Sequence, residues 1–126
     1  MPSEPIILVA DDDEDILNLV LKRLARRGWE VVGASNGTDA LDKARSLRPS
    51  AVVLDWMMPG MTGPEVCEAI KAGADTAAIP VVLVTARASG GDRNAGLAHG
   101  ADDYVTKPFE IDELDGVLRR LVGVAT

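Results

Sequence analysis

Side chains whose chemistry suits phosphate and metal ions stand at intervals along the chain. They are Asp11, Asp12, Asp13, Asp55, Thr85, Thr106 and Lys107. Carboxylates that are brought together repel one another unless a cation neutralises them. Oxygen ligands from two loops suit Mg²⁺, which takes few protein ligands and keeps waters that a phosphate can replace. A remaining carboxylate could then act as a nucleophile toward phosphorus, with the lysine and a hydroxyl balancing charge on the transferred group.

Each of these residues also has an ordinary structural explanation. An aspartate just before a helix can cap it, as Asp13 could do, and a lone lysine such as Lys107 could simply be solvated. Asp55 precedes a Pro-Gly pair and could belong to a turn. The chemical interpretation therefore depends on whether the fold gathers the residues in one place.

The chain contains five short runs that are typical of strands. The runs 6–10, 51–54 and 81–84 lack polar alternation and are rich in Val, Ile and Leu, which indicates parallel strands buried on both faces. The runs 30–34 and 103–106 mix polar residues with β-branched or aromatic ones, which indicates edge strands. Trp29, just before one of these, is expected to cover the sheet edge.

Between the runs, apolar residues recur at helical spacing. These segments lie around 16–24, 40–47, 66–70 and 114–122, and a short helix flanked by glycines is predicted at about Gly91 to His99. Strand and helix therefore alternate five times. This predicts one α/β domain over 1–126, a doubly wound five-stranded parallel sheet in the order 2-1-3-4-5 flanked by five helices.

This strand order brings the candidate residues to one edge of the sheet. In open α/β sheets, ligands bind at the carboxyl ends of the strands, beside the point where the order reverses. Asp11, Asp55, Thr85 and Lys107 stand at the carboxyl ends of the first, third, fourth and fifth strands. Carboxylates, a hydroxyl and an ammonium are therefore expected to converge on one crevice.

Composition excludes several classes of function. The 126 residues include 13 Lys and Arg against 20 Asp and Glu, a formal net charge of −7, so the surface repels nucleic-acid phosphates. No apolar run approaches the roughly 20 residues that span a bilayer, and the single Cys67 cannot form an internal disulfide. A soluble, cytoplasmic protein is expected, with no binding to nucleic acid or membrane.

Four stretches carry the candidate residues in a specific combination: ILVADDDED, VVLDWMMPGMTG, VVLVTA and GADDYVTKPF. Through them the chain resembles, over essentially its whole length, the receiver domain of two-component response regulators, a chemotaxis-receiver-like family with a flavodoxin-like fold. The resemblance implies that Asp55 accepts a phosphoryl group from a histidine kinase phosphohistidine, with Mg²⁺ as cofactor. It implies a signalling domain that catalyses at most its own phosphorylation and dephosphorylation.

The resemblance also implies a metal site and a lifetime for the phosphoryl group. Asp12, Asp55 and the backbone carbonyl of Met57 would hold Mg²⁺, and Asp11 would act through water. The side chains of Met57 and Arg87 would flank the route by which water attacks the phosphoryl group. Neither is an acid or an amide that positions water, so slow self-dephosphorylation is expected.

Three further roles follow from the same resemblance. Thr85 and Lys107 would bind phosphoryl oxygens. Tyr104 would be the aromatic switch that turns inward together with Thr85. The peptide before Pro108 would be cis, a conformation open to an X-Pro bond, and would aim the lysine into the crevice.

The expected partners are proteins. A sensor histidine kinase or a histidine phosphotransfer protein would donate the phosphoryl group. The surface formed by 91–99, 103–106 and the last helix would act on a downstream target, or on an effector domain beyond Thr126. The chain would be a monomer or a phosphorylation-dependent homodimer. Charged residues available for pairing on this surface are Asp102, Asp103, Arg119 and Arg120.

Two other functions fit parts of the pattern. A phosphatase of the haloacid-dehalogenase kind also forms an aspartyl phosphate, but its DxDx[TV] motif, begun at Asp11 and Asp13, fails at Asp15, and the chain is short for the usual cap. A pseudo-receiver would keep the fold and bind partners without phosphorylation. A calcium loop fails, because Ile16 and Lys22 stand where Gly and Glu are needed.

Overall fold

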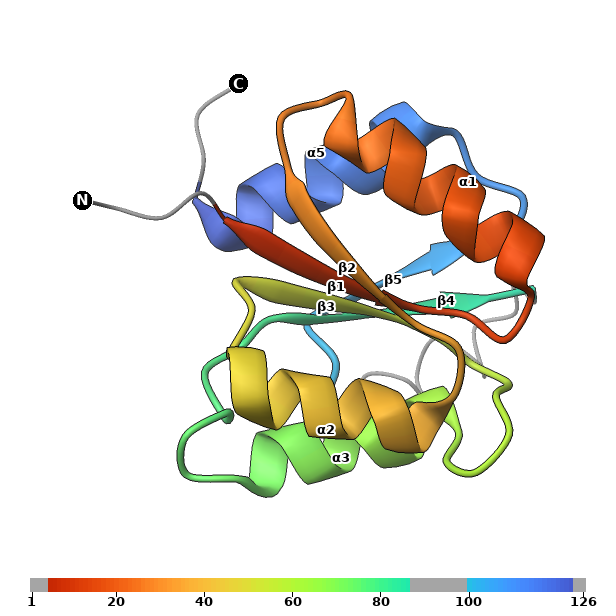
Figure 1. Ribbon diagram of the computed structural model, residues 1–126. Coiled ribbons are helices and arrows are strands. Elements are labelled where there is room, and N and C mark those ends of the chain that lie inside the picture. The colour runs from red at the N-terminus through yellow and green to blue at the C-terminus, as the bar shows by residue number, and fades with distance from the viewer. Residues whose placement is uncertain (1–4, 87–99, 124–126) are drawn as a thin grey trace.

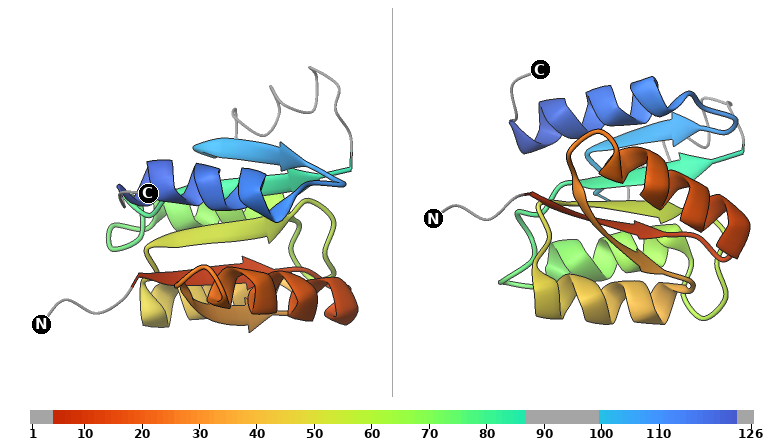
Figure 2. Two further views of the ribbon diagram at one scale, coloured as in Figure 1. Left: turned by 90° about the horizontal axis from the view of Figure 1, so that it is seen from above. Right: turned by 45° about the horizontal axis from the view of Figure 1, so that its top comes forward.

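The computed structural model describes residues 5–86 and 100–123, which form a five-stranded parallel sheet between two layers of helices. The strands are β1 (Ile6–Ala10), β2 (Glu30–Ala34), β3 (Ala51–Asp55), β4 (Val81–Thr85) and β5 (Asp103–Thr106). They lie in the order β2-β1-β3-β4-β5, which the left view of Figure 2 shows. The predicted doubly wound α/β fold and its strand order are therefore confirmed.

Helices of the described part of the chain cover both faces of the sheet, as Figure 1 shows. The helices are α1 (Glu14–Ala25), α2 (Gly37–Leu47), α3 (Gly63–Ala72) and α5 (Ile111–Val122). Helices α1 and α5 pack on one face, and α2 and α3 pack on the other. The helix predicted at 91–99 lies outside the described residues, so four of the five expected helices are observed. None of the helices in 5–86 and 100–123 is long and apolar enough to cross a membrane.

The two apolar layers follow from the alternation of side chains along each strand. In β1, Ile7 and Val9 face α1 and α5, whereas Leu8 and Ala10 face α2 and α3. The central strands are buried on both faces, and the edge strands β2 and β5 are only partly buried. The contrast between the two kinds of run in the sequence has this physical origin.

The starts of α1 and α3 are fixed by side chains that accept hydrogen bonds from backbone N–H groups of the first helical turn. Asp13 caps α1, since its carboxylate accepts from the backbone N–H groups of Asp15 (3.0 Å) and Ile16 (3.2 Å). Thr62 caps α3 in a capping box with Glu65. Because Asp13 is engaged in this cap, the other two members of the acidic run are left for chemistry.

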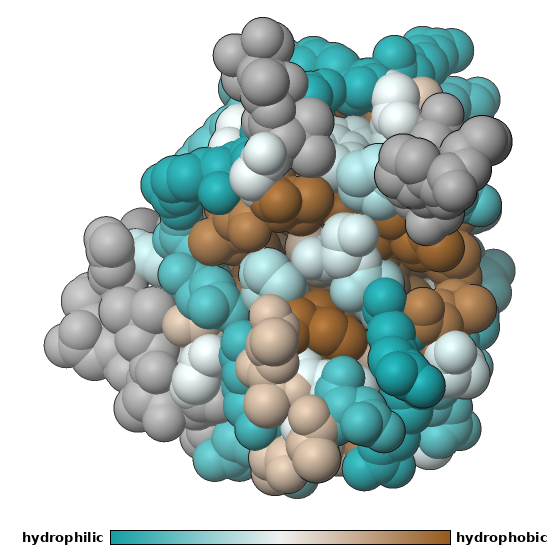
Figure 3. All heavy atoms as spheres, turned by 90° about the vertical axis from the view of Figure 1, so that its left-hand side faces the viewer, coloured by the Kyte–Doolittle hydropathy of each residue, from teal (hydrophilic) through white to brown (hydrophobic). Residues whose placement is uncertain are grey.

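The two ends of the sheet differ in character. The carboxyl ends of β3 and β4 include Asp55 and Thr85, so each strand is one residue longer than expected. Figure 3 views the opposite end, where the strands begin, and shows hydrophobic residues in the centre of a hydrophilic rim. Strand β1 begins and α5 ends on that side of the molecule (Figure 1). The candidate residues for phosphate chemistry therefore lie at the end away from it.

Gly63 allows α3 to begin directly against the strand that carries Asp55. A Cβ atom at Gly63 would lie 2.4 Å from the backbone carbonyl oxygen of Asp55, a contact that neither backbone can relieve without moving. We expect Gly63→Ala to lower the free energy of unfolding by about 1–3 kcal/mol. Urea denaturation measures the change.

Gly116 provides the matched control. It lies inside α5, and a Cβ atom there would have nothing within 4 Å. Gly116→Ala should therefore raise the free energy of unfolding by about 0.5–1 kcal/mol, because alanine is the better helix former. A Gly63→Ala variant as stable as Gly116→Ala would contradict the close approach of α3 to β3.

Candidate functional site

Three carboxylates meet at the carboxyl edge of the sheet. One oxygen each of Asp11, Asp12 and Asp55 lies within 4.8 Å of the other two. Asp11 is only 6% exposed, Asp55 is partly buried and Asp12 is exposed. Residues far apart in the sequence are thus brought together because β1 and β3 are neighbours in the sheet.

Strand alternation gives Asp11 and Asp55 a common face. Asp11 continues the alternation of Ile7 and Val9, and Asp55 continues that of Val53, all on the side of α1 and α5. The backbone of Asp11 donates to the carbonyl of Ala34 (3.1 Å). Its carboxylate accepts from the backbone N–H of Asp13 (2.9 Å). Hydrogen bonds therefore hold both the backbone and the side chain of Asp11 in place.

Lys107 lies between two of the carboxylates. Its ammonium nitrogen Nζ is 3.2 Å from Oδ2 of Asp11 and 3.2 Å from Oδ1 of Asp55. Its backbone N–H donates to the carbonyl of Thr85 (2.7 Å), which places the residue directly after β5 beside the end of β4. The Lys107–Pro108 peptide bond is cis. The lysine is thus anchored through its backbone and directed at the carboxylates through its side chain.

The charges of this group shift one another's pKa values. Burial raises the pKa of Asp55 above its ordinary value, and the nearby charge of Asp11 raises it further, while Lys107 opposes both effects in part. Burial would lower the pKa of Lys107, but attraction to Asp55 and Asp11 outweighs burial, and the net shift is upward. The lysine therefore stays charged, and the ionised form of the Asp55 carboxylate is destabilised.

The carboxylates fit a hard divalent cation. Ligand oxygens around Mg²⁺, bound at 2.0–2.1 Å in an octahedron, lie roughly 3 to 4 Å apart, and the three carboxylates already approach within 4.8 Å. Three carboxylates and one ammonium leave two negative charges unbalanced. One divalent ion would balance them, and the exposure of Asp12 leaves that side open to water or a phosphate.

Thr85 and Tyr104 lie on the neighbouring strands with a different orientation. Thr85 ends β4 and is 4% exposed; by alternation it shares the side of Val81 and Leu83, which face α2 and α3. Tyr104 is partly buried against the same apolar cluster. The register pairs Asp55 with Val84, which puts Thr85 one residue farther along the adjacent strand. Arg87 lies outside the described residues.

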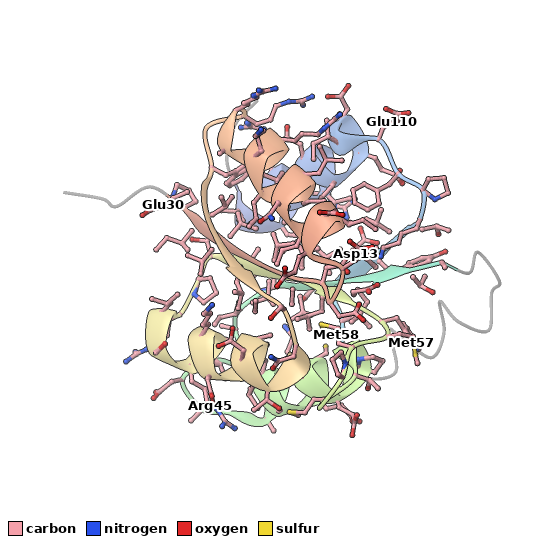
Figure 4. The ribbon with its side chains drawn as sticks, turned by 45° about the vertical axis from the view of Figure 1, so that its right-hand side comes forward. Asp13, Glu30, Arg45, Met57, Met58 and Glu110 are labelled. Carbon is pink, nitrogen blue, oxygen red and sulfur yellow. The ribbon has the colours of Figure 1, made fainter. Side chains whose placement is uncertain are left out.

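The loop after β3 presents one methionine and buries the next. Met57 is 68% exposed and Met58 is 7% exposed. The backbone of Trp56 donates to the carbonyl of Val84 (2.8 Å) and accepts from the N–H of Gly63 (2.9 Å), which holds the loop between β4 and α3. In Figure 4, both methionines and Asp13 lie around the carboxyl edge of the sheet, far from Glu30.

An apolar groove of about 630 Å³ opens beside Lys107, between α1 and the loop that follows β5. Its lining residues include Ile16, Leu19, Val20, Arg23, Pro108, Phe109 and Ile111. Ile16 and Leu19 are 38% and 48% exposed. Sequence reasoning missed this groove, although these two apolar residues on α1 lie outside its buried stripe of Leu17, Val20 and Leu24.

Comparisons with known proteins agree with this geometry. A family model described as the response regulator receiver domain matches residues 7–119. The chain is 44% identical over 120 residues to the response regulator MprA of Mycolicibacterium vanbaalenii, and 43% identical over 116 residues to that of Mycobacterium avium. These matches cover 95% and 92% of the chain but 51% and 50% of the relatives. The chain thus spans about half the length of the curated relatives it matches.

Solved structures give the same result. The receiver domain of the Francisella response regulator 1452 is similar with a TM-score of 0.89 at 33% identity, covering 94% of this chain and 97% of that one. The chemotaxis response regulator CheY4 of Vibrio cholerae has a TM-score of 0.88 at 31% identity, covering 94% and 99%.

Repulsion among the three carboxylates should affect the stability of the fold. In metal-free buffer, Asp12→Asn should raise the free energy of unfolding by about 0.5–1 kcal/mol, because one of three mutually repelling charges is removed. The same variant should lose most of the stabilisation that Mg²⁺ gives to the wild type by binding the native state. Urea denaturation with and without Mg²⁺ measures both effects.

Asp13→Asn is the control, since it removes the same charge from the adjacent residue and keeps a side chain that caps a helix. It should leave the response to Mg²⁺ nearly unchanged. Equal behaviour of the two variants would contradict a cation site at the three carboxylates.

Proposed function

Because the chain belongs to the family of response regulator receiver domains, we propose that Asp55 is the residue that accepts the phosphoryl group. The chain is a receiver domain of two-component signalling. The observation that carries the assignment is the placement of Asp55 at the end of a central strand, where Lys107 and two further carboxylates surround it. We propose no enzymatic activity beyond the domain's own phosphorylation and dephosphorylation.

The proposed reaction moves a phosphoryl group from nitrogen to oxygen. A carboxylate oxygen of Asp55 attacks phosphorus, the O–P bond forms, and the P–N bond to the donor imidazole breaks, with its electron pair returning to that nitrogen. Mg²⁺, held by Asp12, Asp55 and the backbone carbonyl of Met57 with Asp11 acting through water, would supply positive charge at the phosphoryl oxygens. Lys107 is already within 3.2 Å of the acceptor and would move onto the same oxygens.

Thr85 and Tyr104 are the proposed switch residues. A new phosphoryl group on Asp55 extends beyond the sheet edge, toward the neighbouring strand that Thr85 ends. Its hydroxyl would bind a phosphoryl oxygen, and Tyr104, packed on the same side of the sheet, would turn inward with it. The change would then alter the surface around β5 and α5.

The apolar groove beside Lys107 supports a protein as the phosphoryl donor. A small phosphodonor needs only the crevice, whereas a phosphohistidine on a protein brings a surface with it. The groove, with Ile16 and Leu19 exposed on its wall, lies next to the reacting group and can bury apolar side chains of that surface. We therefore propose a sensor histidine kinase or a histidine phosphotransfer protein as donor, docked at this groove.

The remaining proposals concern the wider setting. We propose that 1–126 form a single receiver domain in the cytoplasm, a setting that fits a chain whose single cysteine, Cys67, cannot form an internal disulfide. The output partner would be a downstream protein or an attached effector domain. The charged residues considered for a homodimer are paired within the chain: Asp102 with Lys71, and Asp103 with Arg120. A dimer built on them would have to exchange these pairs.

Phosphorylation of Asp55 is tested directly with the purified chain and the sensor kinases of its source organism. In the presence of Mg²⁺ the wild type should acquire one phosphoryl group, mapped by borohydride reduction of the aspartyl phosphate to homoserine at position 55. Asp55→Asn should acquire none. A folded wild type that accepts no phosphoryl group from any donor would be a pseudo-receiver, and repeated turnover of phosphate esters would identify a phosphatase; either result contradicts the proposal.

The groove is tested in the same assay with two exposed leucines. Leu19→Ser should slow transfer from the protein donor by about 5- to 10-fold and leave acetyl phosphate labelling unchanged. Leu47→Ser, at a residue of similar exposure on α2, should change neither rate. Equal slowing by the two variants would remove the groove from the donor interface.

The lifetime of the phosphoryl group tests the roles of Met57 and Arg87. The exposed side chain of Met57 follows the acceptor by two residues and offers no group that orients water. We expect the double variant Met57→Asn, Arg87→Glu to shorten the phosphoryl half-life by about tenfold or more, because an amide and a carboxylate can position the attacking water. Decay of labelled protein after removal of the donor measures it, and an unchanged half-life would contradict both assignments.

A further inference from the structure

A buried polar network joins α5 to the loop that follows α1. Asp115 on α5 is 8% exposed; its Oδ1 accepts from Nε1 of Trp29 (2.7 Å) and its Oδ2 from Nε of Arg119 (2.9 Å). Arg119 also donates to the carbonyl of Arg27 (2.9 Å), and its guanidinium carbon lies 5.2 Å from the centre of the Trp29 ring. Arg27 pairs with Asp115 at 3.7 Å and with Asp112. These five residues are called the Asp115 network.

The network is directional in a way that apolar packing is not. Both oxygens of the Asp115 carboxylate are occupied, so its bonds fix one rotation of α5 about its axis. The apolar stripe of the same helix, with Leu114 and Leu118, packs on the sheet through contacts that have no preferred direction. Burial alone would raise the pKa of Asp115, but the bonds from Trp29 and Arg119 outweigh it and lower the pKa, which keeps the carboxylate ionised and the network intact.

The rotation of α5 is connected to the reacting group through a short loop. Only residues 108–110 separate Lys107 from the first turn of α5. Phe109 and Ile111 pack in the same apolar cluster as Trp29 and Leu114. A turn of α5 would therefore move the loop and with it the lysine ammonium, which lies 3.2 Å from a carboxylate oxygen of Asp11 and 3.2 Å from one of Asp55.

We propose that the Asp115 network positions Lys107 for the phosphorylation of Asp55. It holds α5 in the rotation at which the loop 107–110 directs the ammonium into the crevice. Its members touch neither the acceptor nor the phosphoryl group and act through α5. This proposal rests on the proposed function and adds to it a set of residues, outside the crevice, on which the rate of phosphorylation depends.

The test compares two buried residues of the same helix. Asp115→Ala breaks the network, whereas Leu118→Ala shortens a fully buried apolar side chain that makes none of the network's hydrogen bonds. The rate of phosphorylation by acetyl phosphate at saturating Mg²⁺ should fall by about 3- to 30-fold in Asp115→Ala and stay at the wild-type value in Leu118→Ala. Asp115→Asn should recover part of the rate, because its amide oxygen can still accept from Trp29.

A second measurement observes Lys107 without any phosphodonor. The NMR resonance of its side-chain Cε, assigned from Lys107→Ala, should shift in Asp115→Ala and keep its position in Leu118→Ala. If the wild type were never phosphorylated, the proposed function would fail, and this resonance would still decide whether the network positions the lysine.

Wild-type rates and an unmoved resonance in a folded Asp115→Ala would overturn the proposal and leave the network a purely structural feature. Should this variant not fold, Trp29→Phe removes the indole N–H and keeps an aromatic ring in the same cluster. The phosphorylation rate and the Lys107 Cε resonance of Trp29→Phe then test the proposal. A slower rate and a shifted resonance support it, and wild-type values of both overturn it.

Discussion

The structure depends on the way in which negative charge is tolerated at the carboxyl edge of the sheet. At an effective dielectric constant near 20, an ammonium about 3 Å from a carboxylate is attracted by roughly 5 kcal/mol, and two carboxylates nearly 5 Å apart repel by roughly 3 kcal/mol. Lys107 can therefore offset the repulsion between Asp11 and Asp55, which it contacts. It leaves the charge of Asp12 without compensation of this kind, and this imbalance is what makes the three carboxylates fit a divalent cation.

Much of the fold could be predicted because buried strands have a characteristic pattern of apolar residues in the sequence. Strands buried on both faces are continuous apolar runs, and this identifies β1, β3 and β4 as central and β2 and β5 as edges. With the strand order known, Asp11, Asp55 and Lys107 must lie at one edge. Alternation of side chains also accounts for the common face of Asp11, which follows β1, and Asp55, which ends β3, since each continues the pattern of its strand.

The features that could not be predicted are contacts between elements with no local signal. Trp29 was expected to cover the sheet edge; the sequence did not predict that it would be 5% exposed and hydrogen bonded to Asp115, a residue 86 positions away. The sequence around Trp29 does not indicate its hydrogen-bond partner. Asp115 lies on a helix, where a carboxylate is most often exposed, so it would not be expected to bind a buried indole. The groove beside Lys107 was missed for a related reason, since a groove forms only when α1 and the loop after β5 come together.

The division of the sheet into two faces would constrain the path of the proposed signal. Asp55, Lys107 and the groove lie on the side of α1 and α5, whereas Thr85 and Tyr104 belong to the side of α2 and α3. A side chain inside a strand contacts one layer only, so a charge added there would be felt on one face. Asp55 is the last residue of β3, and a group attached to it extends past the end of the sheet, where the two sides meet. The end of a central strand is therefore the position from which a charge received on one face can act on the other.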